Sequence, residues 1–439
     1  MIRPLRNLTG AMLRYPLLSF LALLLLVIGA GAASAFLWSQ YQLDAARKAL
    51  GRYAFDEAQH HLDLCLKVRW RSPAVHFLAA QTARRRDDYE EAEKHLEECI
   101  RLGGMTPEIA LEKMLASAQQ GDFDRDETSL RARTTADDPD AVLVLEALAK
   151  GYASRFWDSN TIVCLNFLLE RQPAHPLAML MRARAWENRA RKGEMERDQD
   201  ALRDYEKAVE LALSFEARQG LAGTLYRVGR PWEAALLYER LRSLQPANPA
   251  LLLGLARCRY NLHEVDEARQ LLDSLLEEHP KDAGGLLERG RLALHAGQFE
   301  DAEKWLRRAA AAAPRYNSEA QRLLCRCLEA ANKTAEARAC LDELREREAK
   351  VIDVERLIAR ANREPQNAEL RYQIALELMS QGREEDAVGY LYLILQQDRQ
   401  NGPARQALAD YFERTGQLAR AARQRRAIVP SNRASTPSR

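Results

Sequence analysis

Aromatic side chains make up only 7% of the 439 residues, and helix-breaking residues are few, with 16 prolines and 21 glycines. This composition, rich in alanine, leucine, glutamate and arginine, argues against a sheet-based fold and predicts an all-α protein. A strong net charge is also lacking, because 65 basic and 63 acidic side chains leave a charge of +2. No global field favours nucleic acid, which is therefore not an expected partner.

Cysteines in metal-ligand spacing are absent as well, since no CxxC pair occurs, and we expect no zinc site. Cys325 and Cys327 are the closest pair, but residues two apart on a helix point to different faces. We expect every cysteine to be a small buried apolar residue that gives no information about the compartment. The seven positions are Cys65, Cys99, Cys164, Cys258, Cys325, Cys327 and Cys340.

The motifs of several enzyme classes are missing too. No GxxxxGKS/T, HExxH, GxSxG or EF-hand loop occurs in the chain. His60 and His61 are adjacent rather than at helical ligand spacing, and the other histidines are scattered. Because nothing assembles a nucleophile with a base, we expect no enzymatic activity, no cofactor, no metal and no small-molecule substrate.

One long apolar run lies near the amino terminus. Leu17 to Trp38 is 22 residues without a charge, and as a helix it would reach about 33 Å, enough to cross a bilayer. We expect residues 16–38 to form a transmembrane helix or signal anchor. The short segment before it, residues 1–15, is basic because it contains Arg3, Arg6 and Arg14. The positive-inside rule then favours a single-pass protein whose remainder is non-cytoplasmic.

A cleaved signal peptide is the alternative interpretation of this run. Ala33-Ser34-Ala35 fits the small-residue pattern of a cleavage site. Cleavage would release a secreted or periplasmic protein. We favour a retained anchor because the apolar stretch is long for a signal peptide.

A period of about 34 residues runs through most of the remaining chain. The phrases FDEAQHHLDLCL, from Phe55, and YEEAEKHLEECI, from Tyr89, each centre on an alanine that follows another small residue by twelve positions. Small residues at this spacing let two antiparallel helices approach closely, and a leucine or tyrosine four positions after the alanine fills the gap. The central alanines are Ala58, Ala92, Ala201, Ala234, Ala268, Ala302, Ala337, Ala387 and Ala421.

This combination resembles the tetratricopeptide repeat, and the chain is similar to bacterial, single-pass membrane-anchored members of that family. The resemblance implies a right-handed superhelical solenoid of antiparallel helix pairs, preceded here by one transmembrane helix. Each unit would touch mainly its neighbours. After the anchor we expect repeat units in 39–106, degenerate helical repeats in 107–175, repeat units in 176–350, an extra helical segment in 351–367, C-terminal units in 368–428 and a disordered basic tail in 429–439.

In this family the first helix of each unit lines the concave surface that binds peptides or helices of partner proteins. The residue after the first small residue is an arginine in several units, so the resemblance implies a row of guanidinium groups that could grip carboxylates. The alternative is that these arginines pair with Glu187, Glu288 and Glu329. The candidate partner-binding residues are Arg184, Tyr226, Arg257, Tyr260, Asn261, Arg291 and Arg326.

These features predict a membrane-tethered scaffold or adaptor that binds an unidentified protein partner in the groove. The alternative is a structural, self-associating or regulatory subunit of a membrane complex whose basic C-terminal end touches anionic lipid or nucleic acid. That end contains no acidic residue from Arg414 onward, and a solvated terminal helix with a loose tail is the simpler interpretation. Its arginines are Arg414, Arg420, Arg423, Arg425, Arg426, Arg433 and Arg439.

Overall fold

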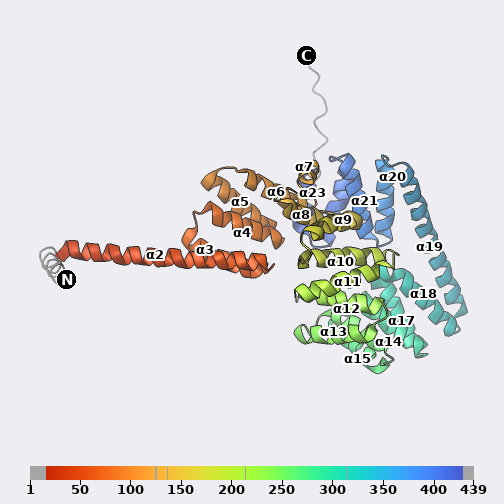
Figure 1. Cartoon of the computed structure of the whole chain (residues 1–439). Coiled ribbons are helices and arrows are strands. Elements are labelled where there is room, and N and C mark those ends of the chain that lie inside the picture. Colours follow the sequence, from red (N-terminus) through yellow and green to blue (C-terminus); the bar gives the residue numbers. More distant parts are fainter. Residues whose placement is uncertain (1–15, 124–125, 136, 213, 313, 429–439) are drawn as a thin grey trace, which may run out of the picture. The chain divides into compact units, whose positions relative to one another are not determined.

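The computed structural model describes residues 16–428, apart from 124–125, 136, 213 and 313. Within these ranges every regular element is an α-helix, and consecutive helices pack against each other from Pro16 to Gly103 and from Ala141 to Arg426 (Figure 1). The expected all-α array of helix pairs is therefore confirmed. The basic segment 1–15 and the tail 429–439 lie outside the described residues.

The described part of unit 1, Met1–Ser117, starts with a helix that has no break between the expected span and the first repeat. This helix, α2 (Pro16–Gly51), is 36 residues long because no proline follows Pro16 within it. Large apolar side chains from Phe20 to Trp38 are exposed, whereas Ser39, Leu43 and Ala46 are buried. The other helices are α3 (Phe55–Arg69), α4 (Pro73–Arg85), α5 (Tyr89–Gly103) and α6 (Pro107–Gln119), whose last two residues belong to the second unit.

Unit 2, Ala118–Arg439, continues as a stack of helix pairs. The six-residue α7 lies in 107–175, the region whose repeats lack a central alanine. The carboxyl half of the 30-residue α19 contains most of the expected extra segment, 351–367. The helices are α7 (Glu127–Ala132), α8 (Ala141–Ser154), α9 (Asp158–Arg171), α10 (Pro176–Arg191), α11 (Arg197–Leu211), α12 (Phe215–Arg227), α13 (Pro231–Leu244), α14 (Pro249–Asn261), α15 (Val265–Glu278), α16 (Ala283–His295), α17 (Phe299–Ala312), α18 (Pro314–Ala330), α19 (Thr334–Arg363), α20 (Ala368–Ser380), α21 (Glu384–Gln397), α22 (Gly402–Arg414) and α23 (Leu418–Arg426).

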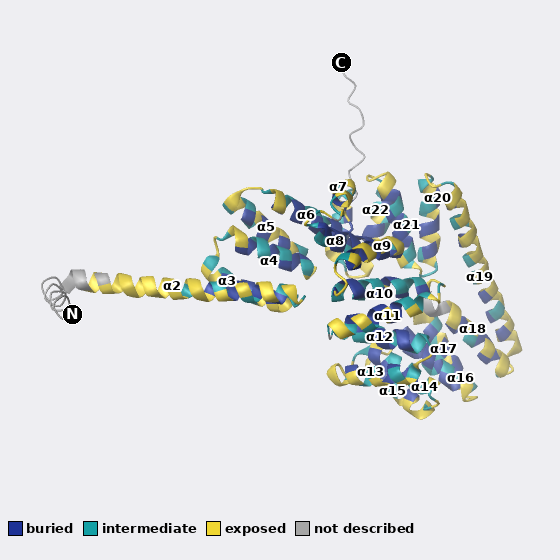
Figure 2. Cartoon of the chain, in the orientation of Figure 1, coloured by how far each residue is buried: buried dark blue, intermediate teal, exposed yellow. Residues whose placement is uncertain are grey.

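The central alanines are buried in both units, as the repeat pattern predicts. Ala58, Ala234 and Ala302, for example, are fully enclosed, and so are the small residues Ala46 and Ala222 of the facing helices. Figure 2 shows the buried residues along the sides of the helices that face their neighbours. Small side chains at these points let the helix axes approach, and the larger residue one turn later fills the remaining space.

Two of the seven cysteines differ from the expectation that all are unmodified apolar residues. Cys325 in α18 and Cys340 in α19 form a disulfide with a Cα–Cα distance of 5.5 Å. The sequence did not reveal this pair because the two residues are 15 positions apart, on different helices, and only the packing of the hairpin brings them together. The five other cysteines are free and buried.

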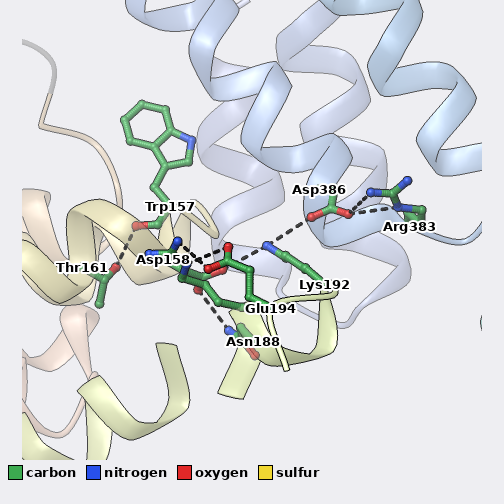
Figure 3. A network of polar contacts seen from close by, with 9 residues as sticks. Trp157, Asp158, Thr161, Asn188, Lys192, Glu194, Arg383 and Asp386 are labelled. Atoms are coloured by element: carbon green, nitrogen blue, oxygen red, sulfur yellow. Dashed lines mark hydrogen bonds and ion pairs between the residues drawn. The ribbon is translucent and has the colours of Figure 1, made fainter. Parts of the chain in front are cut away.

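The first and last helix pairs of unit 2 contact each other (Figure 3). Trp157, just before α9, donates a hydrogen bond from its indole Nε1 to the carbonyl oxygen of Gly389 in α21, at 3.2 Å. The Lys192 Nζ lies 3.0 Å from a carboxylate oxygen of Asp158 and 3.1 Å from one of Asp386. We call this contact the seam; it consists of residues 154–158 and 192 on one side and of 386–392 and 420 on the other.

A buried arginine forms the centre of the seam. Arg155 is 1% exposed and donates from its Nε to the carbonyl oxygen of Gly121 at 2.8 Å. Its guanidinium carbon lies 4.7 Å from the ring centre of Tyr392 in α21. Arg420 in α23 adds a 3.0 Å hydrogen bond to the Ser154 carbonyl oxygen. The expectation that each repeat touches mainly its neighbouring repeats is therefore incomplete, because within unit 2 the first and last helix pairs also contact each other.

Candidate protein-binding surface

The first helices of successive repeats lie on the inner side of the unit 2 stack. Helices α10, α12, α14, α16 and α18 contact one another as well as their own hairpin partners. In a curved stack only the helices on the shorter, inner side come close enough for such contacts. All seven predicted partner-binding residues lie on these five helices.

Two of the predicted arginines share one buried carboxylate. Arg257 in α14 donates from its Nε to Glu288 Oε1 at 2.7 Å, and Arg291 in α16 approaches Glu288 Oε2 at 3.3 Å. Arg291 also pairs with Glu319 in α18. Glu288 is only 7% exposed, so its contacts with the two arginines are charge-assisted and buried. The Arg257–Glu288 and Arg291–Glu319 pairs join neighbouring repeats, whereas Arg291 and Glu288 both belong to α16. The sequence-based alternative, pairing with Glu288, therefore holds for these two arginines.

The predicted tyrosines flank the same cluster. Tyr226 is half-buried, and its burial together with the Glu288 carboxylate raises the pKa of the phenol. Tyr260 is hydrogen-bonded to His295, with 2.7 Å between the hydroxyl oxygen and Nδ1. The cavity between Arg257, Tyr260, Glu288 and Arg291 is only about 10 Å³, about the space of one water molecule. This cluster therefore joins repeats and leaves little room for a ligand.

A second cluster surrounds Glu187 in α10, which is 9% exposed. Its carboxylate accepts hydrogen bonds from the Tyr205 hydroxyl at 2.7 Å, from Arg191 at 2.6 Å and from Arg227 at 3.0 Å. Arg227 also donates to Asp198 at 2.8 Å. The sequence identified Glu187 but missed Arg227, although its position five residues after the small Ala222 marks it as an inner-face residue.

Comparison with known proteins settles the family. Three family models described as tetratricopeptide repeat match this chain, at residues 73–102, at 225–290 and 293–361, and at 347–429. These ranges fall on the helix pairs whose central alanines are buried. The chain is a tetratricopeptide-repeat protein. Repeats of this type support a role in protein–protein interaction.

Individual relatives are distant. The Protein CTR9 homolog of Arabidopsis thaliana is 36% identical over 78 residues, which is 18% of this chain and 7% of that protein. Among solved structures, a tetratricopeptide repeat protein from Parabacteroides merdae is 17% identical with a TM-score of 0.35, covering 66% of this chain and 98% of that one. Yeast Tom70 is 13% identical with a TM-score of 0.35, covering 89% and 91%. Human IFIT1 with m7Gppp-AAAA is 14% identical with a TM-score of 0.42, covering 80% and 88%. Likeness at this level has no bearing on what this chain binds.

Three predicted residues of the tetratricopeptide-repeat surface remain available to a partner. Arg184 in α10, Asn261 at the end of α14 and Arg326 in α18 are exposed. Neither arginine makes an ion pair or hydrogen bond with any residue in the described part of the chain. The inner face therefore has paired arginines in its middle and uncommitted ones in α10 and α18.

The basic C-terminal end is partly neutralised by the repeats. Arg414 lies 2.9 Å from the Glu384 carboxylate, and Arg425 pairs with Glu413. Arg420 is committed to the seam. Arg433 and Arg439 lie outside the described residues. These contacts reduce the positive charge that this end could offer to lipid or nucleic acid.

A polar cleft of about 440 Å³ lies at the seam. Its cations are already paired: Arg189 lies 2.6 Å from Glu194, and Lys192 contacts Asp158 and Asp386. Burial opposes the charge on Lys192, but the two aspartates outweigh it and raise the pKa of the amine. The cleft residues therefore hold the repeats together. No group of three or more histidine, cysteine or acidic side chains in the described ranges could hold a metal ion.

Proposed function

We propose that this protein is a membrane-tethered adaptor that holds a partner protein on the inner face of unit 2, with its repeats on the non-cytoplasmic side. The apolar half of α2 supports the tether. Its large described side chains, from Phe20 to Leu37, are mostly more than half exposed, although such residues are rarely left in water together. The part of α2 from Leu23 to Gly51 is long and apolar enough, by length and composition, to contain a segment that crosses a bilayer.

The tether is tested by removing residues 1–37 and extracting membranes with alkaline carbonate. We expect the full chain to stay in the membrane pellet and the shortened chain to be released. The cut should precede Ser39, because the Ser39 carbonyl oxygen lies 3.4 Å from the Cys65 Sγ and belongs to the first repeat. Release of the full chain, or a mature amino terminus at the Ala33–Ala35 site, would instead support a cleaved signal peptide.

The disulfide supports a non-cytoplasmic location of the repeats, because disulfides persist mainly in oxidising compartments. Peptide mapping of the chain isolated from its host with free thiols blocked should recover Cys325 linked to Cys340. Reduction of this disulfide should lower the stability of the α18–α19 pair by about 3 kcal/mol, because the bond closes a loop of 15 residues and so restricts the unfolded chain. Recovery of both cysteines as blocked thiols would count against this location.

The uncommitted arginines support a carboxylate-bearing partner on the inner face. Replacing Arg184 and Arg326 together by alanine should weaken partner capture by at least about tenfold, because each charge-assisted hydrogen bond is worth roughly 1.5–3 kcal/mol. The measurement is recovery of a partner first identified by crosslinking in intact membranes. Arg257 and Arg291 are unsuitable for this test, since their loss would leave Glu288 buried without its partners.

The matched control for this test replaces two arginines of outer helices. Arg240 in α13 and Arg338 in α19 are exposed, and their side chains make no ion pair with any residue that the structure describes. Their double alanine variant removes the same charge and should leave capture unchanged. Equal losses in the two double variants would show that only net charge matters and that the inner face is not the binding surface.

A further inference from the structure

The carboxyl end of α3 lies beside the point where α2 leaves the expected membrane span. The Arg69 guanidinium carbon is 4.3 Å from the ring centre of Phe36. Because α2 is one unbroken helix, Phe36 lies about 3 Å deeper in the expected span than Trp38, the last residue of that span. The turn that follows Arg69 is therefore level with the last apolar residues of the span.

The last three residues of α3, together with the turn that follows, have the composition of a membrane interface. Lys67, Val68, Arg69, Trp70 and Arg71 alternate basic and apolar side chains. Trp70 is 55% exposed, and the Arg71 guanidinium carbon lies 4.4 Å from its ring centre. In the described part of the chain, the three cations form no ion pair. Tryptophan and snorkelling arginine or lysine side chains are the residues enriched at headgroup level.

The turn is held in place from inside unit 1. His76 Nε2 lies 2.8 Å from the Trp70 carbonyl oxygen. The other ring nitrogen of His76, Nδ1, lies 3.0 Å from Nδ1 of the buried His95 in α5. These contacts hold the backbone of the turn in place. The Trp70 side chain is therefore exposed from a backbone that is itself held by hydrogen bonds.

The two edges of unit 1 differ in charge. The α5–α6 turn lies on the same edge as Trp70, because the Cys99 Sγ near the end of α5 is 3.3 Å from the Pro73 carbonyl oxygen, and this turn carries the 59% exposed Met105. The opposite edge is formed by the α2–α3 and α4–α5 turns. There Arg86 is paired with Asp56 at 2.8 Å. Glu57 there is paired with Arg52 and Glu90 with Lys94, and Asp87 and Asp88 add two further acidic groups.

We propose that the edge formed by residues 67–71 and Met105 rests on anionic phospholipid headgroups of the leaflet from which α2 emerges. The proposal depends on the membrane tether proposed above. Three observations support the proposal: the turn lies beside the end of the expected span, its cations form no ion pair in the described part of the chain, and its tryptophan is exposed. The contact fixes the first repeat directly at the bilayer surface, because α2 enters that repeat without a flexible linker.

The test places a photoreactive benzoylphenylalanine at position 70 of the full chain in nanodiscs of phosphatidylcholine and radiolabelled phosphatidylglycerol. We expect labelled lipid adducts after illumination. The matched control places the same residue at Tyr89, an aromatic position at the opposite edge of unit 1, where no adduct should form. Replacing Arg69 and Arg71 by glutamine should lower the adduct yield at position 70 at least about threefold in these discs, because each cation near the surface is worth about 1 kcal/mol.

Failure of this proposal can be told apart from failure of the tether. If alkaline carbonate releases the full chain, the tether itself is wrong. If the chain resists extraction but positions 70 and 89 give equal adduct yields, the tether stands and the edge does not contact lipid. Adducts at position 70 to a membrane protein in native membranes, with none to lipid, would also overturn the proposal in favour of a protein neighbour.

Discussion

Replacing Arg84 by alanine is expected to destabilise unit 1 by about 3–5 kcal/mol, because it leaves a carboxylate buried without its cation. Arg84 in α4 pairs with Glu112 in α6, and the two side chains are 1% and 3% exposed. A long cation and its partner are thus enclosed between two repeats. We expect amide exchange in α4, α5 and α6 to accelerate by more than about 100-fold, since each factor of ten corresponds to about 1.4 kcal/mol.

Two control variants separate the buried charge from other effects. Replacing Lys94, whose pair with Glu90 is solvent-exposed, should change stability by less than about 0.5 kcal/mol. The double variant Arg84→Met with Glu112→Leu should recover most of the stability, because apolar residues of similar volume often replace a buried ion pair without loss. If Arg84→Ala alone behaved like the Lys94 variant, the pair would not be buried in solution.

Replacing Gly220 by alanine should destabilise unit 2 by about 1–3 kcal/mol, although alanine favours helices. A Cβ atom at Gly220 in α12 would lie 2.3 Å from the Tyr205 ring. Tyr205 is 1% exposed and donates to Glu187, so its ring cannot move without breaking that hydrogen bond. We expect faster amide exchange in α10 to α13, measured by mass spectrometry.

The control for this variant lies one turn further along the same helix. A Cβ atom at Gly223 would meet its nearest neighbour, the Tyr238 hydroxyl, at 3.4 Å, so Gly223→Ala should be neutral or stabilising by up to about 1 kcal/mol. Gly254 in α14 faces the Tyr238 ring at 2.4 Å and should behave like Gly220. Equal effects at positions 220 and 223 would contradict the close packing of glycine against tyrosine.

These glycine–tyrosine contacts show how far sequence reasoning could reach. The repeat pattern identified Tyr205 and Tyr238 as the large residues four positions after Ala201 and Ala234. It did not indicate that the next helix carries glycine where the ring approaches, as Gly220 does. The signal is present in the sequence, because both units with tyrosine at this point have a glycine 15 or 16 residues later.

The candidate surface was predicted only in part. The period placed Arg184, Arg257, Arg291 and Arg326 at one equivalent point, but it could not show that Glu288 lies between two of them. Side-chain pairing depends on rotamers and on the offset between neighbouring helices, and neither repeats with the period. Arg184 and Arg326 therefore differ from Arg257 and Arg291 in availability despite their equivalent positions.

The sequence by itself determined the helices, their pairing and the family, because small residues at a fixed spacing specify contacts between adjacent helices. Only the tertiary structure decided which residues meet across long distances in the chain. Trp157 and Gly389 are 232 positions apart, and their contact depends on small rotations that accumulate over many repeats. The disulfide and the contact between Arg69 and Phe36 likewise depend on how whole helices are offset, which no local pattern specifies.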